Sequence, residues 1–205
     1  MGQITAFDLN EYIQKYKIKQ YIETGTGEGV SLEYAQKYEF TSLFSIDIDE
    51  ELYGRATNKF KNDTRITLIN DYSTNALKLL IPKLDESPVL FFLDAHFPGA
   101  DFHKTSYEES IRKYKNDAFP LEDEIKIICE LRNFNQDVIV VDDFVLYDKN
   151  PNYESIKNGQ VWEYEWLQNE LEIKTESSFI YELFGNSHNI TKDYRHQGYL
   201  IITPK

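Results

Sequence analysis

The sequence has little of what builds a disulfide-stapled, exported or membrane-spanning protein. Cys129 is the single cysteine among 205 residues, which excludes an internal disulfide and a zinc site made of several cysteines. No apolar run approaches the ~18 residues that a transmembrane helix needs. Residues 1–16 have neither the basic nor the apolar region of a secretory signal. We therefore expect a cytoplasmic protein that does not associate with membranes.

Positive charge is also scarce. The chain has 22 Lys and Arg residues against 35 Asp and Glu residues, which gives a net charge of −13, and no basic run is longer than two residues. A chain of this charge is repelled by phosphate backbones and by anionic lipid. We therefore expect a small-molecule partner rather than nucleic acid or a membrane surface.

Aromatic residues are plentiful, at 15% of the chain. We expect most of them to fill the core in place of Leu and Val. The aromatic residues within 100–119 and 148–166 also suit stacking on a sugar face or a planar ring.

Short apolar strands alternate with amphipathic helices along the chain, which predicts a single α/β domain over residues 1–205 with a largely parallel sheet. The expected strands are 20–23, 43–46, 66–69, 89–93 and 138–141, followed by an antiparallel pair at 179–184 and 199–203. Helices are expected after Asp8, from Ser31, after Asp49 and around 74–80. Two more are expected from Pro120 (burying Leu121, Ile125, Ile128 and Leu131) and within 161–171. Residues 98–119 show no periodicity, which predicts a substrate-binding or lid loop.

Each of the five central strands is followed by, or ends in, a carboxylate. These are Glu23, Asp47, Asp71, Asp94, and the pair Asp142 and Asp143. Ligands of open α/β sheets bind at the carboxyl ends of the strands. Asp also caps helices, which explains one or two of these residues but hardly all of them. We expect the acids to be balanced by a cationic or hydroxyl-rich ligand or by a metal ion.

A glycine-rich turn, Gly25-Thr-Gly-Glu-Gly29, follows the first strand. It lacks the third glycine of the dinucleotide fingerprint, and it lacks the Lys-Ser/Thr of a phosphate-binding P-loop. Glu23, just before the turn, disfavours a pyrophosphate and favours a cationic or zwitterionic ligand.

This turn, followed by Asp47, Asn70-Asp71 and Asp94, resembles motifs I to IV of class I S-adenosylmethionine-dependent methyltransferases. The resemblance implies a Rossmann-like three-layer α/β/α sandwich with a mostly parallel seven-stranded sheet and an antiparallel last strand. It implies that the turn packs against the methionine moiety, that Asp47 binds the ribose, and that Asp71 binds the adenine between Ile48 and Tyr72. The implied cofactor-binding residues are Glu23, Gly25, Thr26, Gly27, Gly29, Ser31, Asp47, Ile48, Asp71, Tyr72 and Asp94.

A narrower resemblance is to the metal-dependent O-methyltransferases of the catechol and macrolide-sugar types. These enzymes place one acid after the fourth strand and an acid pair after the fifth, and here those positions hold Asp94, Asp142 and Asp143. The resemblance implies that these three residues bind Mg²⁺, which prefers hard oxygen ligands. The alternative is that Asp142 and Asp143 only cap the following loop.

The position that carries a lysine base in the catechol type is occupied here by the stretch from His96 to Gly99. Together with Asp94, His96 is therefore the candidate catalytic residue, since its ordinary pKa suits a base at neutral pH; it could equally be a metal ligand. His103 and Lys104 are weaker candidates. His188 and His196 are expected to be exposed polar residues.

The leading hypothesis is an enzyme that methylates a hydroxyl of a small molecule or sugar with S-adenosylmethionine and Mg²⁺, in carbohydrate or natural-product tailoring, and that can form a homodimer. An NAD-dependent oxidoreductase is the second hypothesis, because Asp47 also suits a ribose, although the missing third glycine and Glu23 count against it. The third is a non-catalytic cofactor-binding domain.

Overall fold

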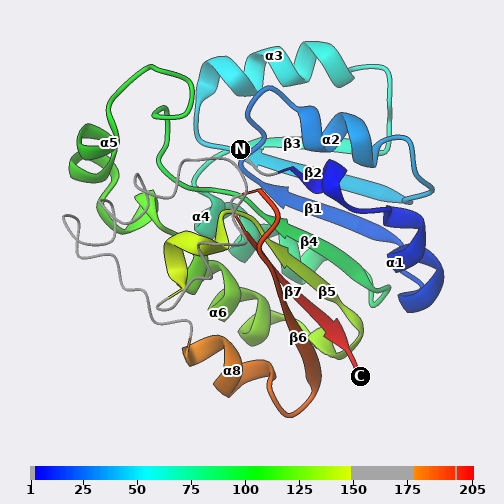
Figure 1. Cartoon of the computed structure of the whole chain (residues 1–205). Coiled ribbons are helices and arrows are strands. Elements are labelled where there is room, and N and C mark those ends of the chain that lie inside the picture. The colour runs from blue at the N-terminus through cyan, green and yellow to red at the C-terminus, as the bar shows by residue number, and fades with distance from the viewer. Residues whose placement is uncertain (1–2, 149–177, 197) are drawn as a thin grey trace.

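A seven-stranded sheet runs through the centre of the molecule (Figure 1). The computed structural model describes residues 3–148, 178–196 and 198–205. The strands are β1 (Gln20–Thr24), β2 (Ser42–Asp47), β3 (Ile66–Asn70), β4 (Val89–Leu93), β5 (Val138–Val141), β6 (His188–Asp193) and β7 (Tyr199–Pro204). Their order in the sheet is β3-β2-β1-β4-β5-β7-β6. β7 is antiparallel to both of its neighbours, and β1 to β5 pair in parallel. The expected α/β class and the antiparallel last strand are confirmed.

Helices cover both faces of this sheet (Figure 1). On one face lie α1 (Leu9–Tyr16), α2 (Val30–Ala35) and α3 (Glu50–Phe60), and on the other lie α4 (Ser73–Leu80), α6 (Leu121–Leu131) and α8 (Ser178–Phe184). α5 (Tyr107–Tyr114) lies off the sheet, beyond the carboxyl ends of the parallel strands. Short 3-10 helices span Ile4–Ala6, Ile81–Lys83, Lys115–Ala118, Phe134–Gln136 and Phe144–Tyr147.

The alternation of side chains along β4 divides the core into two layers. Phe91 and Leu93 face α4 and α6, whereas Leu90 and Phe92 face α1 to α3. All residues of β4 are buried, as expected for a parallel strand that is covered on both sides. The continuous apolar run in the sequence is therefore explained by helices on both faces.

Two elements near the C-terminus differ from the sequence-based expectation. Residues 179–184, expected to form a strand, belong to helix α8, and the strand that pairs with β7 is β6. Ile180 and Phe184 are buried one helical turn apart, while Tyr181 and Leu183 are exposed, so the apolar spacing is helical. His188, expected to be exposed, begins β6 and is buried; His196 is exposed, as expected.

The long segment after β4 is also more regular than expected. It contains α5, which begins with a capping box: Ser106 accepts a hydrogen bond from the backbone N–H of Glu109, and Glu109 accepts one from Ser106. Such a reciprocal pair marks a helix start in the sequence. Leu131, expected in the core, is 42% exposed at the end of α6. The helix expected within 161–171 lies outside the described residues. Within the described ranges, no helix is both long and apolar enough to cross a bilayer.

Candidate functional site

A cavity opens at the carboxyl ends of β1 to β4, where the topology brings the strand-terminal acids together. It is lined by Gln3, Gly25, Thr26, Gly27, Glu28, Val30, Ser31, Ile46, Asp47, Ile48, Asp49, Leu52, Asp71, Tyr72, Ser73, Asp94, Ala95, His96, Phe97, Pro98, Gly99, Asp101, Phe102, Asp117 and Pro120. Nine of the predicted cofactor-binding residues are in this lining, and Glu23 and Gly29 are not. Ligand sites of open α/β sheets lie at this edge, so the cavity is the candidate site.

The glycine-rich turn forms one wall of the cavity and needs glycine for two reasons. Gly25 and Gly27 have positive φ angles, +81° and +52°, which side chains rarely adopt. A Cβ atom on Gly25 would also lie 2.5 Å from the backbone oxygen of Asp94. The turn therefore lies directly against the end of β4, with its backbone exposed to the cavity.

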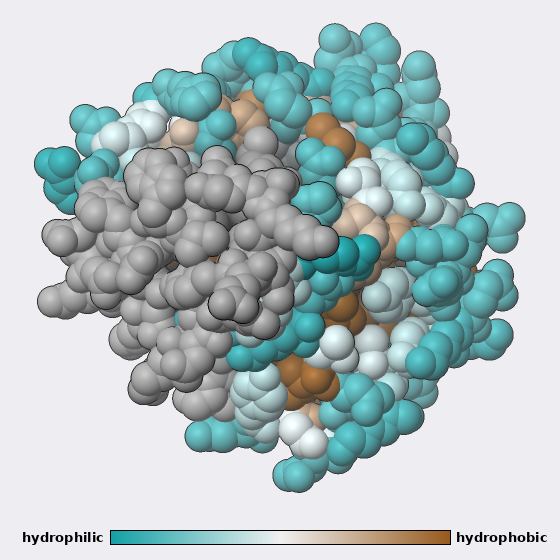
Figure 2. All heavy atoms as spheres, viewed as in Figure 1, coloured by the Kyte–Doolittle hydropathy of each residue, from teal (hydrophilic) through white to brown (hydrophobic). Residues whose placement is uncertain are grey.

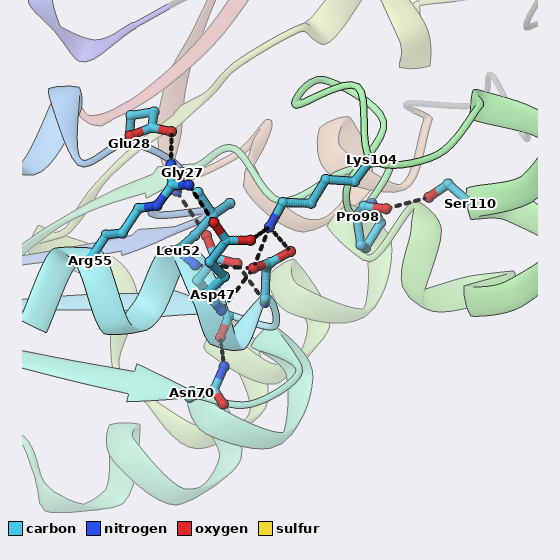
Figure 3. Close-up of polar contacts among 11 residues, drawn as sticks. Gly27, Glu28, Asp47, Leu52, Arg55, Asn70, Pro98, Lys104 and Ser110 are labelled. Atoms are coloured by element: carbon cyan, nitrogen blue, oxygen red, sulfur yellow. Dashed lines mark hydrogen bonds and ion pairs between the residues drawn. The ribbon is translucent and has the colours of Figure 1, made fainter.

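Asp47, the last residue of β2, holds this turn in place. Its Oδ2 accepts a hydrogen bond from the N–H of Gly27 at 2.8 Å, and its Oδ1 accepts one from the N–H of Asp49 at 2.8 Å (Figure 3). Burial raises the pKa of Asp47, although these backbone bonds oppose the shift. Each carboxylate oxygen has a second lone pair, so Asp47 can also accept hydrogen bonds from a ligand hydroxyl.

The next wall is formed by Asp71 and Tyr72, which follow β3, and by Ile48, which follows β2. Oδ1 of Asp71 accepts a hydrogen bond from the N–H of Tyr72 at 2.7 Å and another from the amide of Asn75 at 3.2 Å. Tyr72 is 36% exposed. An apolar side chain, an aromatic ring and a carboxylate thus meet, which suits a planar heterocycle with an amino group.

Glu23 lies beneath the turn rather than in the cavity wall. It is fully buried in β1, and its carboxylate accepts hydrogen bonds from Ser45 at 2.6 Å and from Tyr21 at 2.7 Å. Burial raises the pKa of Glu23 to about 7, against the effect of these bonds. Ser45 also hydrogen-bonds Thr26, which does line the cavity. Glu23 therefore supports the turn through Ser45 and Thr26.

A third wall of the cavity carries His96, which contacts carboxylates through both ring nitrogens. Its Nε2 lies 2.9 Å from Oδ2 of Asp143 and 3.4 Å from Oδ2 of Asp101, and its Nδ1 lies 3.7 Å from Oδ1 of Asp94. Burial would lower the pKa of His96, but its hydrogen bonds to Asp101 and Asp143 outweigh that effect and raise the pKa well above the ordinary value. The structure thus favours an imidazolium that balances the surrounding acids.

The acids around His96 influence one another. Burial, followed by the charge of Asp142, raises the pKa of Asp94 well above its ordinary range. Burial and the charge of Asp143 do the same for Asp142. Burial would also raise the pKa of Asp101, but the hydrogen bond from His96 outweighs it and the pKa is lowered. Like charges at close range disfavour joint ionisation, so this edge of the sheet favours an added positive charge.

The predicted magnesium ligands fit a Mg²⁺ ion only in part. Carboxylate oxygens suit Mg²⁺, and Oδ2 of Asp142 is buried with no hydrogen-bond partner among the described residues. Asp143, however, is bonded to His96. Within the described part of the chain, no group of three or more His, Cys, Asp or Glu residues is placed to hold a metal ion. The donor set suits the ion chemically, but it is not preassembled around one.

Sequence reasoning missed Asp101 and gave too little weight to Phe102 and Lys104. Asp101 and Phe102 line the cavity, and Lys104 forms ion pairs at its rim. All three lie in the loop after β4, where no periodicity indicates which side chains turn inward. His103 is exposed. The aromatic candidates at 153–166 lie outside the described residues.

Comparison with known proteins relates the chain to others by fold. No protein-family model and no curated protein matches the sequence. A caffeoyl-CoA O-methyltransferase-like protein from Staphylococcus aureus matches with a TM-score of 0.60 at 13% identity, over 100% of this chain and 85% of that one. The O-methyltransferase TomG from Streptomyces achromogenes, solved with S-adenosylmethionine, has a TM-score of 0.55 at 13% identity, over 96% and 78%. The N-methyltransferase NodS from Bradyrhizobium japonicum has a TM-score of 0.50 at 10% identity, over 96% and 92%.

At these identities the likeness concerns the fold alone, and it includes proteins that methylate oxygen and nitrogen. The strand order and the antiparallel β7 agree with the architecture that the sequence motifs predicted. The chain has the Rossmann-like fold of class I S-adenosylmethionine-dependent methyltransferases.

Proposed function

We propose that this protein is an S-adenosylmethionine-dependent methyltransferase that acts on a hydroxyl group of a small molecule or sugar. The observation that carries the proposal is that one cavity at the carboxyl edge of the sheet is lined by Gly25–Gly27, Asp47, Asp71 and Asp94. The fold likeness supports the cofactor, since the matched TomG structure contains S-adenosylmethionine. The net charge of −13 favours a small acceptor over nucleic acid.

In this proposal each wall binds one part of the cofactor. The exposed backbone of the turn at Gly25–Gly27 lies along the methionine moiety. Asp47, with lone pairs left on both oxygens, accepts hydrogen bonds from the ribose hydroxyls. Asp71 accepts one from the adenine amino group, and Ile48 and Tyr72 flank the ring.

Methyl transfer requires the acceptor hydroxyl to lose its proton and to be held in line with the methyl group. Asp94 lines the cavity beside His96, so its carboxylate is placed to accept this proton. His96, held as an imidazolium, stabilises negative charge that develops on the acceptor oxygen. We therefore assign proton acceptance to Asp94 and charge balance to His96, which changes the role expected for His96 from its ordinary pKa.

Mg²⁺ assistance is the finer part of the proposal: Asp94, Asp142 and Asp143 would hold the ion, and Asp94 would then be a ligand and not the proton acceptor. When bound, the ion would lower the pKa of the acceptor hydroxyl and orient it. The support is the buried Oδ2 of Asp142, which has no partner among the described residues. Asp143 would have to exchange His96 for the ion.

Calorimetry with S-adenosylhomocysteine and with NAD tests the cofactor. We expect S-adenosylhomocysteine to bind and NAD not to bind, and Asp47→Asn to weaken the binding about tenfold through loss of one carboxylate acceptor. Tight binding of NAD without binding of S-adenosylhomocysteine would make the chain an oxidoreductase instead.

Magnesium is tested by titrating the EDTA-treated protein, loaded with S-adenosylhomocysteine, with Mg²⁺. We expect saturable binding that Asp142→Asn weakens at least about tenfold. Methylation of a panel of catechols and sugars should then fall on EDTA treatment and return with Mg²⁺. Full activity in EDTA would leave His96 as the positive charge of the site.

A further inference from the structure

The loop after β4 forms part of the cavity wall. We call residues 97–105 the strap. Phe97, Pro98, Gly99, Asp101 and Phe102 from the strap line the cavity. Two hydrogen bonds fix its start. The N–H of Phe97 donates to the carbonyl of Ala118 at 3.0 Å. Ser110 donates to the carbonyl of Pro98 at 3.1 Å (Figure 3).

At the far end of the strap, Lys104 forms ion pairs with residues at the start of α3. Its Nζ lies 2.8 Å and 2.7 Å from the two carboxylate oxygens of Asp49, and 3.0 Å from Oε2 of Glu51 (Figure 3). Asp49 is the N-cap of α3 and lies two residues after Asp47. Lys104, from the loop after β4, therefore binds the segment that carries Asp47, the residue proposed to bind the ribose.

Lys104 is also the end of a longer chain of charges. Glu51 pairs with Arg55 on the next turn of α3, and Arg55 Nη1 lies 3.0 Å from Oε1 of Glu28 in the glycine-rich turn. The surface over α3 is hydrophilic (Figure 2). The ion pairs thus join the glycine-rich turn, the start of α3 and the strap, which are three separate walls of the cavity.

The ring of Phe102 completes the closure on the inner side. A Cβ atom added to Gly27 would lie 2.9 Å from Cζ of Phe102, so the ring is packed against the glycine-rich turn. A cofactor lying along the turn would therefore contact Phe102, which belongs to the strap that Lys104 holds.

We propose that Lys104 is a positioning residue of the cofactor site, and that its pairs with Asp49 and Glu51 slow the release of the cofactor. This inference rests on the proposed function. Exposed ion pairs of this kind contribute little individually, while connected and chelated ones contribute more. Lys104 and Glu51 are partly exposed, so the effect is modest and is weakened by salt.

The experiment measures the dissociation rate of S-adenosylhomocysteine by stopped-flow displacement with the full chain. We expect Lys104→Met to raise this rate about two- to fivefold at low ionic strength, and Lys104→Arg to restore it. Lys126→Met is the matched control, because Lys126 pairs with Glu122 on the exposed face of α6 and does not line the cavity. In about 1 M salt, where the screening length is roughly 3 Å, the wild-type rate should approach that of Lys104→Met.

Hydrogen exchange of the ligand-free protein provides a second readout. The N–H of His103 bonds the carbonyl of Ala100, and that of Lys104 bonds the carbonyl of Gly99. We expect Lys104→Met, but not Lys126→Met, to speed exchange at these two amides. Equal dissociation rates in wild type and Lys104→Met would overturn the proposal even if the strap loosens. Absence of any S-adenosylhomocysteine binding by the wild type would instead overturn the proposed function, and the role of Lys104 with it.

Discussion

Gly25 lies where the turn after β1 passes closest to the end of β4. Its φ angle is +81°, and an added Cβ would lie 2.5 Å from the backbone oxygen of Asp94, which is not a flexible side-chain end. Gly25→Ala therefore has to shift the turn or the strand end. We expect the variant to be less stable by about 1–3 kcal/mol and to bind S-adenosylhomocysteine at least about tenfold more weakly, measured by urea unfolding and calorimetry.

Gly54 provides the matched control for that substitution. It lies within α3, and an added Cβ would meet no atom within 4 Å. Alanine is favoured over glycine in a helix by about 0.5–1 kcal/mol, so Gly54→Ala should stabilise the protein by that amount and leave binding unchanged. Equal effects of the two substitutions would contradict the steric argument at Gly25.

Single residues differ in how far the sequence predicts their role. Asp47 and Asp71 were placed in the cavity wall from strand ends alone, because the carboxyl ends of parallel strands meet at one edge. Glu23 was expected there too, but its side chain turns into the core towards Ser45. The direction of a strand residue depends on the pleat register, which the short stretch before the turn did not determine.

Among the elements, α6 carries a buried acid whose protonation should couple folding to pH. Glu124 is 1% exposed, and its Oε1 has no hydrogen-bond partner among the described residues. Burial raises its pKa to about 7, against hydrogen bonds with Ser73 and Thr24. An unfolded glutamate has a pKa of about 4.3. Between these values the folded chain keeps a proton that the unfolded chain releases, so the free energy of unfolding falls as pH rises.

Replacing Glu124 by glutamine should remove this dependence. We expect Glu124→Gln to be close to wild type at pH ~5 and more stable by up to about 3 kcal/mol at pH ~8. Glu130→Gln, an exposed position on the same helix, is the control and should follow wild type. Urea unfolding at both pH values measures these stabilities. A stability difference between Glu124→Gln and wild type that does not change with pH would refute the prediction.

The opposite end of the sheet is held by a buried ion pair between the end of α6 and the start of β5. Arg132 Nε donates to Oδ2 of Asp137 at 2.7 Å, and its other nitrogens donate to the carbonyls of Asp85 and Ser87. Asp137 also accepts a hydrogen bond from the N–H of Val89 at 2.8 Å. The pair, whose side chains are 7% and 1% exposed, therefore joins α6, β4 and β5.

Arg132→Met leaves the carboxylate of Asp137 buried and uncompensated. Breaking one side of such a pair costs about 3–5 kcal/mol, and chemical denaturation should show a loss of this size. Adding Asp137→Asn removes the unpaired charge while keeping an acceptor for Val89, so the double variant should recover part of the loss. A double variant as unstable as the sum of the two single variants would argue against the coupling.

Elements with one clear pattern were predicted, and those with mixed signals were not. β4 and β5 are uninterrupted apolar runs, and α1 and α3 begin at Asp8 and Asp49, which accept hydrogen bonds as N-caps. The segment 178–184 is short and rich in aromatic residues, so its composition resembles a strand, yet its burial has helical spacing. For short apolar segments, tertiary packing overrides propensity.

At the scale of the whole molecule, chain topology concentrates part of the −13 charge at one edge. Five of the acids lie along the edge where the parallel strands β2 to β5 end, namely Asp47, Asp71, Asp94, Asp142 and Asp143. Sequence alone predicted them at this edge, together with His96, but not the placement of the imidazole against Asp101 and Asp143. That placement depends on the path of the loop after β4, which long-range contacts determine.

A ligand that binds across this edge should stabilise the entire fold, since it contacts segments from β1 to β4 that separate on unfolding. At S-adenosylhomocysteine concentrations of about 100 times its dissociation constant, the added stability is roughly 2.7 kcal/mol. For a chain of this length that corresponds to a rise in Tm of about 5–10 °C. NAD should produce no such rise, and Asp47→Asn should reduce it at a fixed S-adenosylhomocysteine concentration, both measured by calorimetric melting. An unchanged Tm at saturating S-adenosylhomocysteine would mean that the cavity does not bind the cofactor whose fold the chain shares.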